Sequence, residues 1–383
     1  MKVVEVVTRL SGGVGRYLAS LDEELRARGV EVIVMAGSVA ESEAEVRLLD
    51  HAPIYVAGLQ RSIGGPSDAS AIRSLTRSLR ELRPDVVHTH LSKAGVVGRV
   101  AAHRAGVHGI IHTFHGHLLN SYFSPPVAWS FLQVERWLAP RSSALVAVSE
   151  NVRDELQSRG VGEPGQWTVL PTVTRSLHGP FLDKSEARSR FGLAGSSKVL
   201  GFFGRLEAVK NCQLFLEAGR AVESRNGDVV LLVAGEGSQR AQLETWSQEH
   251  LPGRVHFVGW QHEPLWAMAA CDVVVSSSRN EGLGLSLMEA AAVGVPIVAT
   301  AVGGVGDVVE DGVNGLLVAP DDANALAVAI ERVLHDPALA RDLVARGSAT
   351  VRERFDVGKG ADRLLDIYQE CAARGAAPKR WSE

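Results

Sequence analysis

Short runs of apolar, largely β-branched residues alternate along the whole chain with segments whose apolar positions recur at helical spacing. In the first half, Val14–Arg28 and Ile72–Leu82 show the helical period. Runs that are apolar throughout and separated by helices are typical of parallel strands covered on both faces. The strands predicted in this half are Val3–Val7, Val30–Met35, Pro53–Val56, Val86–Thr89, Gly109–Phe114, Ala144–Val148 and Thr168–Leu170.

The same alternation starts again in the second half, which predicts a second domain. A chain of 383 residues also exceeds the roughly 250–300 residues at which a single core stops growing. We therefore expect an α/β protein with two doubly wound Rossmann-like domains, residues 1–172 and 185–355, linked near Pro171–Lys184. A last helical pattern covers Gly360–Ala373. The strands predicted in the second half are Lys198–Phe203, Val229–Ala234, Val255–Val258, Val273–Ser276, Pro296–Ala299 and Leu316–Val318.

Open parallel sheets bind ligands outside the carboxyl ends of their strands, where the strand order reverses. With two such sheets facing each other, we expect the site in the cleft between the domains, built from the loops that follow the strands.

Composition narrows the class of protein. A net charge of −4 argues against nucleic-acid binding through a basic surface. Three distant cysteines without Cys-x-x-Cys spacing predict reduced thiols and a cytoplasmic protein. The first apolar run contains Glu5 and is followed by Arg9, so we interpret it as a strand and not as a signal peptide. No stretch approaches the roughly 18 apolar residues of a membrane span.

The loop after the first predicted strand, Ser11–Tyr17, contains Gly12 and Gly13 and leads into a helix. Glycines let the backbone approach a ligand closely, and a helix N-terminus favours an anion. The spacing is not Gly-x-Gly-x-x-Gly and no acidic residue ends the second strand, which argues against a nicotinamide dinucleotide. A tight structural turn is the alternative.

Two loops of the second half carry charged candidates. Arg205 and Lys210 follow the strand that ends near Gly204, and they suit the neutralisation of a diphosphate leaving group. The second loop contains Glu281, before a helix whose first turn holds Gly284, and Glu289 lies about two turns further on. The free N–H groups of the helix start can hold a phosphate, and a carboxylate can take two hydroxyls of a ribose. Solvated helix residues are the alternative for all of these charges.

These motifs together resemble the retaining glycosyltransferases of family 4. The likeness rests on Arg205…Lys210 and on two carboxylates separated by seven residues within Glu281-Gly-Leu-Gly-Leu…Met-Glu289-Ala. It also rests on Gly294–Thr300, Gly303-Gly304 and Asp311–Val318. The first half adds Val86–His90 and His112–Gly116. The resemblance covers nearly the whole chain and implies a GT-B fold whose C-terminal domain holds the sugar donor. It also implies that the helix at residues 360–373 packs back on the first domain.

The resemblance assigns a role to each matching residue. Arg205 and Lys210 would bind the diphosphate with backbone help from Gly204. Glu281, with Gly282 and the amides of Leu283, Gly284 and Leu285, would contact the sugar and phosphate. Glu289 would hold the ribose, and Gln261 would lie along the base. In the first domain, His115 would face the sugar, and Gly12 and Gly13 would lie beside the diphosphate.

We expect no metal requirement and no other cofactor. The chain has no Asp-x-Asp motif, and the two cations with the helix start near Gly284 can supply the positive field instead. His88, His90, His112, His115 and His117 are numerous, but no cysteine or carboxylate near them in the sequence completes a zinc set. We therefore expect packed or hydrogen-bonded roles for most of them.

The expected partners are a nucleotide sugar, with UDP favoured, and an unidentified hydroxyl acceptor such as a glycolipid, a polysaccharide or a small natural product. Leu118–Leu132 is the candidate acceptor segment. Arg73, Arg77, Arg80 and Arg83 recur on one helical face and leave weak contact with the inner membrane face open, although a solvated helix fits as well. A nucleotide-sugar epimerase and a non-catalytic nucleotide-sugar-binding protein are the alternative functions. We expect a hexosyl- or N-acetylhexosaminyl-type glycosyltransferase, and the oligomeric state and the transferred sugar stay open.

Overall fold

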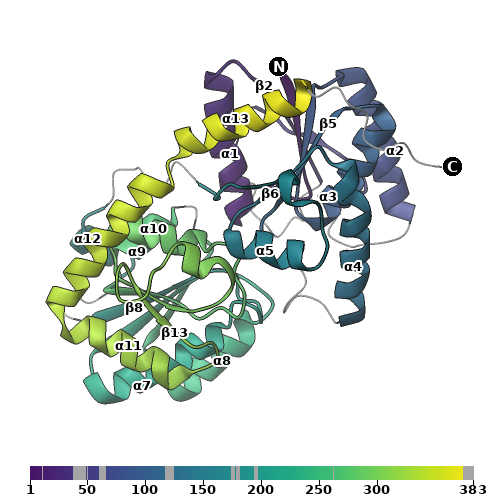
Figure 1. The fold of residues 1–383 in the computed structure, drawn as a ribbon. Coiled ribbons are helices and arrows are strands. Elements are labelled where there is room, and N and C mark those ends of the chain that lie inside the picture. The colour runs from purple at the N-terminus through teal and green to yellow at the C-terminus, as the bar shows by residue number, and fades with distance from the viewer. Residues whose placement is uncertain are drawn as a thin grey trace. The chain divides into compact units, whose positions relative to one another are not determined.

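The computed structural model describes residues 1–10, 12–37, 49, 51–59, 66–116, 125–173, 177, 182–193, 197–261 and 263–373. The chain divides into two compact units. Unit 1 contains Met1–Thr174 together with Asp356–Glu383, and unit 2 contains Arg175–Phe355. Each unit has one parallel sheet with helices around it (Figure 1), which confirms the predicted α/β class with two Rossmann-like domains.

Unit 1 is built on a seven-stranded parallel sheet with the order β3-β2-β1-β4-β5-β6-β7. The strands are β1 (Lys2–Val7), β2 (Glu31–Ala36), β3 (Ile54–Tyr55), β4 (Val86–His90), β5 (Gly109–Phe114), β6 (Ala144–Ala147) and β7 (Trp167–Val169). The helices are α1 (Gly12–Ala27), α2 (Pro66–Leu82), α3 (Ser92–Ala105), α4 (Pro125–Leu138), α5 (Glu150–Ser158) and α13 (Val357–Ala373). All seven strands lie within one or two residues of the predicted bounds.

Unit 2 is built on a six-stranded parallel sheet with the order β10-β9-β8-β11-β12-β13. The strands are β8 (Lys198–Phe203), β9 (Val229–Ala234), β10 (Val255–Gly259), β11 (Val273–Ser276), β12 (Ile297–Thr300) and β13 (Leu316–Val318). The helices are α6 (Lys184–Arg190), α7 (Cys212–Asn226), α8 (Arg240–His250), α9 (Pro264–Ala269), α10 (Leu285–Val293), α11 (Ala323–His335) and α12 (Pro337–Arg354).

Both sheets reverse their strand order once. The reversal lies between β1 and β4 in unit 1 and between β8 and β11 in unit 2, because the chain leaves each first strand to one side and later returns to the other. The loops at the carboxyl ends of these strand pairs diverge, which leaves room for a ligand in a doubly wound fold. Candidate site residues follow these strands in both units.

The core of unit 1 has two parts because side chains of a strand point alternately to opposite faces. Val3 and Val7 of β1 pack in one apolar cluster with residues of α1 and α13, whereas Val4 and Val6 pack in the other with residues of α2 and α3. Helix α13 lies beside α1 on the first face (Figure 1), so the last helix of the chain helps to bury the first strand.

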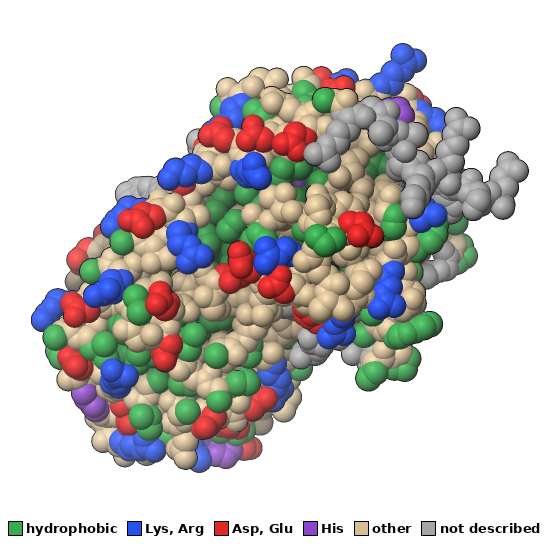
Figure 2. Space-filling model, in the orientation of Figure 1, with side chains coloured by type: hydrophobic (Ala, Val, Ile, Leu, Met, Phe, Trp, Pro, Cys, Tyr) green, Lys and Arg blue, Asp and Glu red, His purple; other side chains and the backbone are tan. Residues whose placement is uncertain are grey.

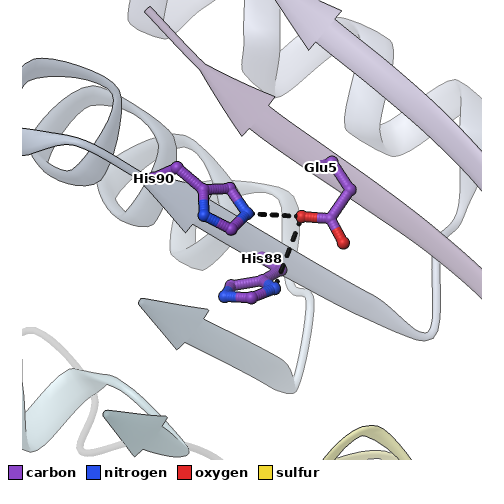
Figure 3. A group of neighbouring side chains, drawn as sticks. All are labelled: Glu5, His88 and His90. Carbon is purple, nitrogen blue, oxygen red and sulfur yellow. Dashed lines mark hydrogen bonds and ion pairs between the residues drawn. The ribbon is translucent and has the colours of Figure 1, made fainter. Parts of the chain in front are cut away.

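Polar groups on this same face join β1 and β4 to α13. Glu5 of β1 accepts a hydrogen bond from the Tyr368 hydroxyl at 2.6 Å, and its other oxygen lies 2.7 Å from Nε2 of His90. His88 lies beside them, with its Nδ1 2.7 Å from the Tyr368 oxygen. Figure 3 shows both imidazoles directed at the Glu5 carboxylate. All four residues are buried.

No carboxylate lies near these histidines in the sequence, but the fold brings Glu5 to them, so a ligand set that the sequence did not predict is present. Glu5 is 85 positions from His90 in the sequence, but parallel pairing of β1 with β4 sets Glu5 opposite His88. The ligand atoms of Glu5, His88 and His90 lie within 4.8 Å of one another, which is close enough for a metal ion. The predicted hydrogen-bonded role of the histidines is confirmed for His88, His90 and His112.

The network sets the ionisation of its members. Burial raises the pKa of Glu5, but its interactions with His88 and His90 outweigh burial and hold that pKa well below the ordinary 4.5. Burial lowers the pKa of His90 from 6.5 to about 4, and the neighbouring His88 lowers it further. In the folded protein near neutral pH, Glu5 is therefore a carboxylate and His90 a neutral imidazole.

These directions predict acid sensitivity of unit 1. A histidine whose pKa falls on folding stabilises the protein above its unfolded pKa, and this stability is lost as the pH falls from 6.5 towards about 4. For His90 the loss amounts to about 1.4 kcal/mol per pH unit, and the lowered pKa of Glu5 adds a further loss below 4.5. The urea concentration at the unfolding midpoint should decrease as the pH is lowered from 7.5 to 4.5. The decrease should be smaller in the His90→Phe variant. A midpoint that stays constant over this range would contradict the prediction.

Candidate active site

The candidate site of unit 2 lies where β8 and β11 end side by side. These two strands pair in register from Val273 opposite Leu200 to Val275 opposite Phe202. The loop after β8 carries Arg205 and Lys210, and the loop after β11 carries Glu281. The pairing therefore brings together two loops that are far apart in the sequence.

An ion pair connects the two loops directly. Nζ of Lys210 lies 2.6 Å from Oε1 of Glu281, and the Ser278 hydroxyl donates to the same oxygen at 2.7 Å. The Lys210 side chain is 21% exposed and the Glu281 side chain 9% exposed, so water screens this pair only partly. The structure thus places two residues predicted to be catalytic in direct contact.

Backbone contacts fix the loop after β8. The Gly204 amide donates to the Ala234 carbonyl, and the Leu206 amide donates to the Glu236 carbonyl. A Cβ on Gly235 would lie 1.9 Å from the Gly204 carbonyl oxygen, so only glycine fits beside this loop. Arg205 lies between these anchored positions and is partly exposed.

The end of the same loop is tied to the loop after β11. Asn211 adopts a left-handed conformation with a φ of 49° immediately before α7. Its backbone carbonyl accepts a hydrogen bond from the Ser277 hydroxyl at 2.9 Å, and its side-chain amide donates to the Asp321 carboxylate at 2.9 Å. These two hydrogen bonds of Asn211 therefore fix the backbone next to Lys210.

The loop after β11 leads into α10 through a left-handed glycine. Gly284 has a φ of 88° and is the N-cap of α10, which begins at Leu285, so the prediction that Gly284 lies inside the first turn is off by one residue. Because glycine has no side chain, the first N–H groups of α10 receive no hydrogen bond from a capping side chain. Gly282, Leu283, Gly284 and Leu285 therefore lie together at a positive helix end beside Glu281.

A second glycine segment, Gly303 and Gly304, contacts the backbone carbonyl of Glu281. The Gly304 amide donates to the Glu281 carbonyl at 3.0 Å. Gly303 has a φ of 50°, and a Cβ there would lie 2.1 Å from the same carbonyl oxygen. The Thr300 hydroxyl donates to the Ser278 carbonyl at 2.6 Å. The loop after β12 thus fixes the backbone at Ser278 and Glu281, and so the position of the Glu281 carboxylate.

Two further predicted donor-binding residues lie on other elements of unit 2. Glu289 is on α10 and is buried, with 1% of its surface exposed. Gln261 follows β10, which lies two strands from β8, and its side-chain amide donates to the Val258 carbonyl at 2.6 Å. The structure records no contact of Gln261 with the Lys210–Glu281 pair among the described residues.

In unit 1, the predicted residues lie at the carboxyl ends of β1 and β5. Gly12, with a φ of 62°, and Gly13 begin α1 after β1, whereas Ser11 lies outside the described residues. His115 follows β5, and its Nε2 lies 2.9 Å from Nδ1 of His90 at the end of β4. The ring of Tyr17 meets that of His115 edge to face at 5.5 Å between centroids.

Burial lowers the pKa of His115 well below 6.5, and the nearby His90 and His88 lower it further. His115 is therefore neutral near pH 7. A neutral imidazole has one donor and one acceptor nitrogen, so it can act toward a ligand as a hydrogen-bonding group but not as a cation.

Sequence reasoning missed several residues that hold the site. Ser278 and Asp321 act through side-chain hydrogen bonds that carry no motif of their own. The sequence does carry one indication of the role of Glu5, because it is the only charged residue between Val3 and Val7 of an otherwise apolar strand. A buried charge is costly unless it is paired, so such a residue implies a partner in the fold.

The candidate acceptor segment is described only in part. Its residues 118–124, and His117 before them, lie outside the described residues. In α4, Phe131 is buried whereas Trp129 is 64% exposed. On α2, Leu75 and Leu79 are buried and the predicted basic positions Arg73, Arg77 and Arg80 are exposed, as is Arg83 just after the helix.

The described part of the surface carries charges of both signs. On the face drawn in Figure 2, Lys and Arg side chains lie among Asp and Glu side chains, so the residues described there form no extended basic surface. None of the described helices is both long and apolar enough to cross a membrane.

Comparison with known protein families gives two matches, one for each half of the chain. The family described as Glycosyltransferase Family 4 matches residues 11–173. The family described as Glycosyl transferases group 1 matches residues 183–350, which contain the Lys210–Glu281 pair.

Individual relatives agree with these families. The chain is 31% identical over 316 residues to a D-inositol 3-phosphate glycosyltransferase of Stackebrandtia nassauensis, covering 78% of this chain and 71% of the relative. It is 28% identical over 326 residues to a UDP-Gal:alpha-D-GlcNAc-diphosphoundecaprenol alpha-1,3-galactosyltransferase of Escherichia coli, covering 82% of each.

Solved structures show the same fold. A sucrose-phosphate synthase from Thermosynechococcus elongatus superposes with a TM-score of 0.83 at 25% identity, over 98% of this chain and all of that one. Anabaena HepE in complex with UDP and glucose superposes with a TM-score of 0.82 at 23% identity, over 97% of this chain and all of that one. The predicted enzyme class is thus confirmed, and the chain belongs to the GT-B glycosyltransferases that combine a family 4 N-terminal domain with a group 1 C-terminal domain.

Proposed function

We propose that this enzyme is a retaining glycosyltransferase that moves a hexosyl group from a UDP-sugar to a hydroxyl acceptor without a metal ion. One observation carries the proposal. Lys210 and Glu281 form an ion pair that joins the loops after β8 and β11, at the point where the sheet of unit 2 reverses its strand order. This is where a doubly wound sheet binds a nucleotide.

The chemistry requires a positive field at the departing diphosphate. Lys210 supplies an ammonium group, Arg205 a forked guanidinium group, and the start of α10 uncapped N–H groups. Because the loops that carry them are fixed by backbone hydrogen bonds, little reorganisation is needed as negative charge develops. This arrangement supports the proposal that no metal ion is required.

The identity of the donor rests on the relatives. The E. coli relative is named for UDP-galactose, and the HepE structure contains UDP and glucose. For this chain we propose a UDP-hexose, with Glu289 on the ribose and Gln261 along the base. In unit 1, we propose that His115 contacts a hydroxyl of the sugar and that Gly12 and Gly13 approach the diphosphate.

We propose a displacement on one face of the sugar. The bond between the anomeric carbon and the diphosphate breaks as the acceptor oxygen bonds to that carbon from the same side. The acceptor proton passes to an oxygen of the leaving phosphate. In this scheme Glu281 orients Lys210 and the sugar, because its Oε1 already accepts bonds from Lys210 and Ser278.

The acceptor class is left broad because the relatives differ in it. They include a galactosyltransferase named for a diphosphoundecaprenol-linked sugar and a D-inositol 3-phosphate glycosyltransferase. A lipid-linked acceptor would suit weak contact with the inner membrane face through the exposed arginines of α2. The relatives named here are transferases, which favours transfer over the epimerase and the non-catalytic alternatives.

Removal of either cation should abolish most of the turnover. In Arg205→Ala or Lys210→Ala, loss of stabilisation of the leaving diphosphate should lower kcat by about 10²- to 10³-fold, with the melting temperature little changed. The measurement is UDP release from UDP-glucose and UDP-galactose, with and without a panel of acceptors. Arg220→Ala, on an exposed position of α7, is the matched control and should behave like wild type. Wild-type rates in either cation variant would remove the proposed role.

A second prediction concerns the contact between Gly303 and the Glu281 carbonyl. Gly303→Ala places a methyl group against the Glu281 carbonyl at a positive φ, so it should destabilise unit 2 by about 1–3 kcal/mol and weaken UDP binding. Gly306→Ala is the control, because a Cβ there meets nothing within 4 Å. Urea unfolding and calorimetric titration with UDP measure both effects. Equal behaviour of the two variants would argue against the support.

The stereochemical proposal has a direct readout. In buffer containing EDTA, proton NMR of the first product formed from an α-linked UDP-hexose should show the α anomer, because displacement on one face retains the configuration. A β-linked product would rule out retention. Turnover that disappears with EDTA and returns with a divalent cation would rule out metal independence.

A further inference from the structure

A continuous series of hydrogen bonds runs from His115 into the sheet of unit 1. Nε2 of His115 lies 2.9 Å from Nδ1 of His90, and Nε2 of His90 lies 2.7 Å from the Glu5 carboxylate. The other Glu5 oxygen accepts from the Tyr368 hydroxyl at 2.6 Å. The members come from β1, β4, α13 and the end of β5, and Figure 3 shows the central part of the series.

The positions of the protons follow from the Glu5 carboxylate. An ionised carboxylate only accepts hydrogen bonds, so the nitrogen of His90 that faces it must carry the proton. A neutral His90 then has no proton on Nδ1, which can only accept. The group that faces Nδ1 is Nε2 of His115, so this nitrogen must be the donor.

The second arm of the network agrees with this assignment. Because the Tyr368 hydroxyl gives its proton to Glu5, its oxygen accepts from Nδ1 of His88. Nε2 of His88 then accepts from the Thr113 hydroxyl at 2.7 Å. Each hydrogen bond therefore has one donor and one acceptor, and no second proton is needed on either imidazole.

We propose that Glu5, acting through His90, is a positioning group that fixes the proton of His115 on Nε2 and leaves Nδ1 as a hydrogen-bond acceptor for a hydroxyl of the transferred sugar. The ligand part of this inference rests on the proposed function, in which His115 contacts the sugar. The proton assignment rests only on the contacts within unit 1. Tyr17 holds the ring of His115 from the side through its edge-to-face contact.

The same three groups, Glu5, His88 and His90, are close enough to hold a metal ion. In the hydrogen-bonded arrangement, however, both Glu5 oxygens and both nitrogens of His90 already have partners. A metal on Nε2 of His90 would replace the proton that the series requires there. The two arrangements therefore differ in one observable, the presence of a proton on this nitrogen.

The proton positions can be read by NMR of the full-length protein labelled with ¹⁵N at histidine side chains. Long-range ¹H–¹⁵N spectra should show His115 and His90 each as neutral imidazoles protonated on Nε2, with signals identified by their loss in His115→Gln and His90→Phe. A proton on Nδ1 of His115, an imidazolium at either residue, or a metal-bound Nε2 of His90 would overturn the proposal. This readout does not depend on turnover.

Kinetics separate positioning from simple support of the fold. His90→Phe removes the acceptor that faces Nε2 of His115, and should lower kcat/KM for UDP-glucose or UDP-galactose, whichever is turned over, by about 10- to 100-fold. Thr113→Val breaks a bond of the same buried network on the arm that leads away from His115, and should stay within about twofold of wild type. Equal losses in both variants would indicate a structural role and overturn the proposal.

Two further results keep this inference distinct from the proposed function. If His115→Ala turns over the donor like wild type, the proposed contact of His115 with the sugar fails, even where the NMR assignment holds. If His90→Phe does not fold, the spectrum of the wild-type protein still decides the proton assignment. Addition of UDP-glucose should shift the Nδ1 signal of His115, and an unchanged Nδ1 signal at saturating donor would contradict its role as the acceptor.

Discussion

Parallel pairing across the strand-order reversal is the constraint on which the rest of the structure depends. In unit 2, β8 beside β11 places Lys210 against Glu281, and in unit 1, β1 beside β4 places Glu5 against His88 and His90. In both units, charged or polar groups distant in the sequence meet because a doubly wound sheet returns the chain to the side of its first strand. The strand pairing therefore brings these groups together.

The two units use this constraint in different ways. In unit 2, the Lys210–Glu281 pair is partly exposed and rests on loops anchored by backbone hydrogen bonds, so it can meet a charged ligand. In unit 1, Glu5 is buried within the sheet, and its influence reaches the loops only through other side chains. In our proposals, the first arrangement presents charge to a ligand, and the second controls where a single proton lies.

The sequence allowed most of the fold to be predicted, because fully apolar strands and helical periods are local patterns. It also allowed Arg205, Lys210, Glu281 and His115 to be selected, since they lie in recognisable motifs. The partners of these residues were not predictable. The Glu5–His90 contact depends on which strands pair, and the support of Glu281 by Gly303 depends on backbone packing between two loops. Such contacts leave no periodic trace in the sequence.

The bond between Tyr368 and Glu5 spans 363 positions and joins α13 to β1. During synthesis on the ribosome, the face of β1 that α13 covers therefore stays open until the whole of unit 2 and then residues 357–373 have been made. Until then, the carboxylate of Glu5 also lacks the hydrogen bond from the Tyr368 hydroxyl. Unit 1 is thus completed only after unit 2 has been made, which makes chaperone protection of this face most useful while unit 2 is being translated.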